Sequence, residues 1–352
     1  MRDSESYQLW IEEIPSRLRF DYVSGRILGS DRYSSYLFIL LIVFIDVPIL
    51  STITYIIHDG QTVHPLIDYG WWILVPIALM IGVFAMKRIR SKYSDAINNV
   101  GKDSGNLEIK SPNRFRIGVY VLSMLVYLPF IAQNLTQFLA SEGQIIGSIK
   151  WLIIIPFFYL PIISEFFVIY IHGLFFLPFS IFQQNIDLDF SDPNKLGGMG
   201  KVGDSMIFAT SFYFIGLALW TGTTIIGPIT GIKATESGPD SFSIGFFMIA
   251  WFVGLLLFFL SLWIIHKHMY TKKQEKIDEL MEEIRKSGQD EEVFPYVNPQ
   301  ERDENIEYMQ KYINLNRVEE TKTYPVDINK IWEFSASAFL PIFLQFSSMY
   351  LL

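Results

Sequence analysis

Asp46 is the residue whose type and position most strongly suggest chemistry, because it stands near the middle of a long apolar run. It lies in Phe44-Ile45-Asp46-Val47-Pro48. An ionised carboxylate at the centre of a membrane span costs several kcal/mol, so Asp46 must face a cavity or a partner. One interpretation makes it a site for an ion or a proton. The other makes it a neutral carboxyl that is hydrogen-bonded to a neighbouring helix or to backbone freed by Pro48.

Glu165 and His172 form a second candidate, further along the chain in another apolar run. Side chains seven positions apart lie on the same face of an α-helix. Together they could form a polar stripe along a water-filled path. The alternative is an interfacial Glu–His pair at the point where the helix leaves the membrane.

The loop Asp187–Gly203 permits three interpretations. Its glycines at 198, 200 and 203 fit G-x-G-x-x-G, but no strand pattern precedes them, as a dinucleotide site requires. Its three aspartates resemble a calcium loop, although the spacing differs and no Glu closes it. The third interpretation is a tight turn whose glycines let the backbone pack against helix ends.

Other chemistry finds little support in the sequence. The chain has no cysteine, and its five histidines lack helical spacing with a nearby carboxylate. Neither a G-x-S-x-G elbow nor a P-loop occurs. We therefore expect no catalytic residue, no metal ligand and no cofactor, and an enzyme is the least favoured class. The net charge of −8 argues against nucleic acid as a partner.

Seven apolar runs approach the 20 or so residues that cross a bilayer. They are Ser34–Ile57, Gly70–Met86, Arg116–Phe138, Ile149–Phe182, Met206–Pro228, Ser243–Ile265 and Ile331–Leu352. Charged residues make up only 18% of the chain, against roughly 25% in soluble domains. We expect an all-α polytopic protein of the cell membrane, with the lipid bilayer as its main partner.

The distribution of cations predicts the orientation. All 28 Lys and Arg residues except Lys150 and Lys233 lie in the N-terminal segment or in loops on the same side of the predicted spans. Positive charge gathers on the cytoplasmic side of membrane proteins. The sequence therefore predicts the N-terminus inside and the C-terminus outside.

Four parts follow along the chain. Residues 1–33 form a cytoplasmic segment, in which Tyr7–Arg19 places Leu9, Trp10 and Ile14 near one face of a predicted interfacial helix. Residues 34–265 hold six spans, residues 266–330 form a cytoplasmic extension, and residues 331–352 form the seventh span. The fourth run is too long for one perpendicular crossing, so it must kink, tilt or project.

The extension is predicted to be a helical hairpin. Ile277, Leu280, Met281 and Ile284 follow the i, i+3, i+4, i+7 pattern of one helix, and Ile306, Met309 and Ile313 share a face of the next. Two such stripes must be buried, either within the hairpin or against a neighbouring subunit. A homo-oligomer is one way to do so.

Two resemblances add to these patterns. Asp192–Gly198, with its Asp-Pro-x-x-x-Gly-Gly pattern, resembles a cytoplasmic loop of uncharacterised prokaryotic multi-pass membrane proteins, a family that carries no known activity. The topology resembles that of insect odorant and gustatory receptor channels, whose last span carries Thr-Tyr, five apolar residues and Gln-Phe. Here Gln345-Phe346 and the apolar spacer match, whereas Thr-Tyr is missing and Pro341 intrudes. That resemblance implies a tetrameric cation channel with Gln345 in the pore.

These observations favour a channel-like or transporter-like protein for small cations or protons. Its candidate path comprises Asp46, Glu165, His172 and Gln345. Acidic residues lie within the predicted spans, and no face of the protein has an excess of positive charge that would attract anions. Both features favour cations over anions. The alternative is a non-conducting membrane scaffold or sensor that binds a partner through its cytoplasmic helices.

Overall fold

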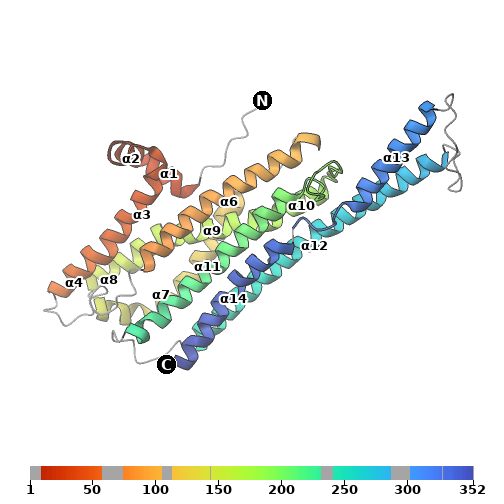
Figure 1. Cartoon of the computed structure of the whole chain (residues 1–352). Coiled ribbons are helices and arrows are strands. Elements are labelled where there is room, and N and C mark those ends of the chain that lie inside the picture. The colour runs from red at the N-terminus through yellow and green to blue at the C-terminus, as the bar shows by residue number, and fades with distance from the viewer. Residues whose placement is uncertain are drawn as a thin grey trace.

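Every element that the computed structural model describes is a helix (Figure 1), which confirms the predicted all-α class. The described residues are 9–57, 74–104, 113–142, 144–230, 241–286, 302–326 and 328–351. Among them, four helical segments are long and apolar enough to cross a membrane: Asp31–Ile57, Ile145–Gln183, Gly200–Leu219 and Phe247–Lys286. Their length and composition indicate a multi-pass membrane protein.

Helices also occur over the other three predicted spans. They are α6 (Leu74–Ser104), α7 (Asn113–Glu142) and α14 (Ile328–Leu351). They do not belong to the four segments above. Seven spans and their orientation therefore stay predictions.

The segments Asp31–Ile57 and Ile145–Gln183, which correspond to the first and fourth predicted runs, are each assembled from several consecutive helical pieces. The first holds η1 (Asp31–Tyr33), α3 (Ser34–Phe44), η2 (Ile45–Leu50) and α4 (Ser51–Ile57). The fourth run holds α8 (Gln144–Ile149), η4 (Lys150–Tyr159), α9 (Leu160–Ile171), η5 (His172–Phe176) and α10 (Leu177–Gln183). At 1.5 Å per residue, the 39 residues from Ile145 to Gln183 would span about 58 Å as α-helix, against about 30 Å of hydrocarbon.

Three of these pieces, η2, η4 and η5, are π-helical. Pro48 lies inside η2 and Pro156 inside η4, and Pro178 follows η5 by two residues. Proline lacks the N–H that an α-helix needs and collides with the carbonyl one turn back. A wider turn with i→i+5 bonds accommodates it, and such turns are frequent at functional sites.

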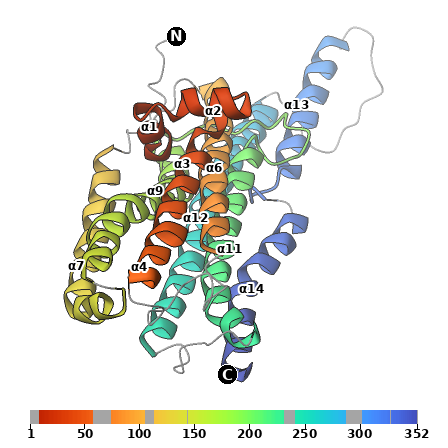
Figure 2. The same ribbon diagram turned by 90° about the vertical axis from the view of Figure 1, so that its left-hand side faces the viewer.

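The helices form an elongated bundle (Figures 1 and 2). α11 (Gly200–Thr230) packs along α6 and α14, α7 packs on α9, and α3 packs on α6. Aromatic rings fill the interior beside α14, where Phe258 and Phe334 stack with centroids 4.2 Å apart. Gly254 is required by this packing, because a Cβ there would lie 2.4 Å from the Tyr213 ring.

α12 (Ser241–Lys286) is one continuous helix of 46 residues, so it extends over about 69 Å. α13 (Arg302–Glu320) packs antiparallel against its far end, well away from the rest of the bundle (Figure 1). Lys273 Nζ donates to the backbone carbonyls of Glu319 and Thr321, at 2.6 and 2.8 Å. The two helices therefore form a hairpin arm.

The hairpin covers only one of its two predicted apolar stripes. Leu280 is buried against Leu315 and Val318, with Ile277 and Ile284 partly buried beside them. Met281, the fourth residue predicted for this stripe, is exposed. On α13, however, Ile306, Met309 and Ile313 are exposed. They lie opposite Leu315 and Val318 on the helix, and the hairpin itself does not cover them.

Two short helices, α1 (Trp10–Arg17) and α2 (Phe20–Leu28), lie across one end of the bundle (Figure 2). The predicted interfacial helix corresponds to α1, but its apolar side faces protein. Leu9, Ile11 and Pro15 are buried, and α1 packs on α3 and α9. The side chains exposed here belong to the α2 region instead: Leu18, Tyr22, Val23, Ile27 and Leu28.

Candidate functional site

Asp46 lies in η2 and is 1% exposed, so the predicted burial of its carboxyl is observed. The Tyr159 hydroxyl, from η4, donates to Asp46 Oδ2 at 2.8 Å. Lys150, at the other end of η4, is also buried and interacts electrostatically with Asp46. Asp46 is therefore the centre of a polar cluster between the first and fourth apolar segments, and we call Asp46, Tyr159 and Lys150 the acidic cluster.

The π-helical turns of η4 explain how Tyr159 contacts Asp46 while the charge of Lys150, nine positions earlier, also acts on Asp46. In an α-helix, with about 3.6 residues per turn, side chains nine positions apart point to opposite faces. The wider π turns bring residues nine apart back to nearly the same face. Sequence reasoning based on the α-helical period missed both residues. Pro156, between them, was the available signal.

The Asp46 carboxyl is only half satisfied. Its Oδ1 is buried and accepts no hydrogen bond from any residue that the structure describes. A buried acceptor without a partner costs about 1–3 kcal/mol. Such an atom can take a proton or bind a cation, and either would remove the deficit.

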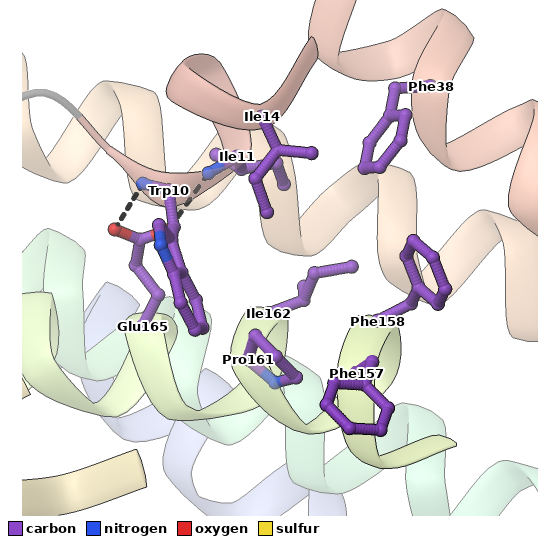
Figure 3. Close-up of a pocket in the computed structure, with 9 residues that line it drawn as sticks. All are labelled: Trp10, Ile11, Ile14, Phe38, Phe157, Phe158, Pro161, Ile162 and Glu165. Atoms are coloured by element: carbon purple, nitrogen blue, oxygen red, sulfur yellow. Dashed lines mark hydrogen bonds between the residues drawn. The ribbon is translucent and has the colours of Figure 1, made fainter. Parts of the chain in front are cut away.

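Glu165 is equally buried, at 1% exposed, but its carboxylate is fully engaged (Figure 3). The backbone N–H of Trp10 donates to Oε1 at 2.7 Å, and that of Ile11 donates to Oε2 at 3.1 Å. Arg116 Nη1, from α7, lies 3.8 Å from Oε1. Glu165 therefore binds the first turn of α1, a role that the sequence patterns did not predict.

His172 has a different set of neighbours from Glu165. Its ring lies 5.8 Å from that of Tyr93 in α6 and 5.0 Å from that of Phe176. His172 Nδ1 and the Tyr93 hydroxyl are buried without a hydrogen bond from the described residues. The predicted Glu–His stripe thus consists of two groups that face different helices. Gln345 lies in α14, and its side chain is outside the described residues.

A narrow apolar crevice lies between α1, α3 and the fourth run (Figure 3). Its volume is about 10 Å³, close to the least that can hold one water molecule. Glu165 lies at one edge, and the rest of the lining is apolar: Trp10, Ile11, Ile14, Phe38, Phe157, Phe158, Pro161 and Ile162. Asp46 does not line this crevice.

The loop Asp187–Gly203 has the geometry of the packing interpretation. The Asp192 carboxylate accepts backbone N–H bonds from Asn194, Leu196 and Gly198, at 3.0, 3.2 and 3.1 Å. Gly197 and Gly198 have φ of 59° and 76°, which glycine adopts freely. In this part of the chain and the other described ranges, no three His, Asp or Glu side chains gather as a metal site would require.

Close packing also explains the last glycine of this loop. A Cβ on Gly203 would lie 2.1 Å from the Pro325 carbonyl oxygen, so the backbone before α14 passes directly over it. Lys195 strengthens the same junction, because its carbonyl accepts from the Lys322 N–H at 2.7 Å and its Nζ pairs with Glu320. The loop joins the bundle to the hairpin arm.

Comparison with known proteins identifies no relative. The chain matches no protein family, no curated protein and no solved structure. The two resemblances seen in the sequence therefore stay predictions. What the geometry supports by itself is a helical membrane protein with a buried acidic cluster.

Proposed function

We propose that this protein conducts or transports small cations across the cell membrane, and that Asp46 is its ion-binding group. The observation that carries the proposal is the buried Asp46 carboxyl, which has one oxygen bound by Tyr159 and the other without a hydrogen bond among the described residues. Retaining such a group inside an apolar bundle costs stability, and intramembrane acids commonly mark ion or proton pathways.

Protons fit this cluster better than metal cations do. Lys150 already supplies a positive charge beside Asp46. A metal ion would have to compete with that ammonium for the carboxylate. A proton can instead pass directly to the carboxyl oxygen, and a neutral carboxyl beside a hydroxyl remains hydrogen-bonded.

The surrounding helix supports an ion path along the same interface. Tyr159 and Glu165 are six positions apart, or about 9 Å along the helix axis. Between them, Pro161 and Ile162 face the apolar crevice. A polar cluster, an apolar constriction and a second polar cluster in sequence form an arrangement in which a narrow constriction can act as a gate.

The proposal includes the predicted topology, with seven spans and the α1 end of the bundle in the cytoplasm. Support comes from the cation distribution and from the position of α1, α2 and the hairpin arm, which carry many of those cations. The acidic cluster then lies on the outward side of Glu165.

Proton flux in proteoliposomes tests the proposal. Asp46→Asn keeps the size and hydrogen bonding of the side chain but cannot ionise, so we expect loss of flux, or of its pH dependence, in a variant that still folds. Asp95→Asn, at an exposed aspartate of α6, is the matched control and should behave like the parent. Normal flux in Asp46→Asn would remove Asp46 from the path.

A second candidate function is a scaffold that binds a partner or another copy through the hairpin arm. The exposed face of α13, with Ile306, Met309 and Ile313, favours it. A parent protein that shows no flux under any ionic gradient would place this candidate first.

A further inference from the structure

In the first turn of α1, the Glu12 carboxylate accepts from the Leu9 N–H at 3.4 Å, but no side chain of α1 itself caps the Trp10 and Ile11 N–H groups. The first N–H groups of a helix have no partner inside the helix, and Ser, Thr, Asp or Asn at the N-cap position commonly supplies one. Here the N-cap residue is Leu9, whose side chain cannot accept a hydrogen bond. The Trp10 and Ile11 N–H groups are bound instead by the two carboxylate oxygens of Glu165, more than 150 residues away.

We propose that Glu165, from a distant part of the same chain, caps α1 (the long-range cap), and that α1 is thereby a detachable plug. It is helical when docked on α9 and unwound when released. An eight-residue helix with Pro15 inside it is too short to be stable alone in water. The Trp10 and Ile11 N–H groups are capped only in the docked position. Docking and helix formation are therefore a single event.

The plug is attached to four other elements of the bundle. Arg116 of α7 lies beside Glu165, and its guanidinium lies 5.7 Å from the Trp10 ring centroid. That ring also meets the Tyr120 ring edge-on, with centroids 5.4 Å apart. On the other side, Arg90 Nη1 of α6 binds Glu12 at 2.6 Å. With α3 and α9 beneath it, α1 bridges four helices of the bundle.

The plug covers the end of the interface between α3 and α9. Ile11 and Ile14 form the α1 side of the crevice and face Ile162 and Phe158 across it (Figure 3). Ile11 is 3% exposed only because α1 is docked. Release of α1 would open the constriction to water from that end, a consequence for conduction that rests on the proposed function.

Thiol labelling measures docking directly. The chain has no cysteine, so Ile11→Cys carries the only thiol and reacts with a maleimide when α1 leaves its seat. Glu165→Gln removes the charge that holds the Trp10 and Ile11 N–H groups. Because charge-assisted hydrogen bonds are strong, their loss should weaken docking enough to raise the labelling rate about tenfold or more. Glu13→Gln, which disturbs only the Glu13–Arg17 pair of α1, is the matched control and should leave the rate unchanged.

A second variant covers the case in which Glu165→Gln does not fold. Glu165→Asp keeps the charge and shortens its reach, so its labelling rate should lie between those of the parent and Glu165→Gln. An unchanged labelling rate in folded variants of Glu165 would overturn the long-range cap.

Flux is measured on the same samples. Faster labelling together with higher flux supports the plug as a gate. Faster labelling at unchanged flux would sustain the cap and overturn its role in conduction. Absence of flux in the parent would count against the proposed function alone, because labelling still decides the cap.

Discussion

Tyr159→Phe is the sharpest perturbation of the acidic cluster. It removes the hydroxyl that donates to Asp46 Oδ2 at 2.8 Å and leaves the ring in place. Because Oδ1 has no hydrogen bond from the described residues, the change leaves both oxygens without a donor from them. Hydrogen bonds to charged groups contribute about 1.5–3 kcal/mol, so we expect the free energy of unfolding in detergent to fall by about that amount.

Tyr120→Phe is the matched control for this measurement. Its hydroxyl also binds the fourth run, donating at 3.0 Å to the neutral carbonyl of Pro156. Loss of a neutral hydrogen bond should cost about 0.5–1.5 kcal/mol. Each tyrosine change is then combined with Asp46→Asn. The Tyr159 cycle should give a coupling free energy within about 0.5–3 kcal/mol, and the Tyr120 cycle should give a value near zero. Equal cost for the two tyrosines, with no coupling to Asp46, would refute the reasoning about the cluster.

Two further predictions concern topology and association. Cysteines placed at Thr62 or Gly238 should label from outside intact cells and those at Ser104 or Glu292 should not; labelling of Ser104 from outside would reverse the orientation. Ile306→Ser together with Ile313→Ser should lower the mass of the detergent-solubilised particle if α13 associates with another copy, because that face is exposed in the single chain. An unchanged mass in this double variant would mean that the α13 face does not bind another copy. Leu280→Ser should instead destabilise the hairpin by about 2–5 kcal/mol, as loss of a large buried side chain does.

The fold class and the burial of Asp46 could be predicted from the sequence, because both follow from local apolarity. The partners of Asp46 could not. Lys150 and Tyr159 lie on opposite faces in the α-helical period that sequence reasoning assumes, and only π-helical turns place them together. Pro48 and Pro156 marked these turns, although a proline alone does not distinguish a kink from a π turn.

Glu165 shows a different limit of sequence reasoning. Its place in an apolar run, on the same helical face as His172, suggested a polar stripe along a water-filled path, and the apolar face of α1 suggested the membrane interface as its partner. The two features in fact satisfy each other, through backbone N–H groups that carry no sequence signal. On α12, by contrast, Ile277, Leu280 and Ile284 pack within the chain, as one of the two predicted arrangements required, whereas Met281 is exposed.

The long-range cap of α1 by Glu165 also has a consequence for the order of events during synthesis. Trp10 precedes Glu165 by 155 positions, so at about 5–20 residues per second the ribosome needs about 8–30 s to deliver the cap. During that interval α1 has been made, but the carboxylate that caps it has not. α1 is thus capped only after the fourth apolar run has been made.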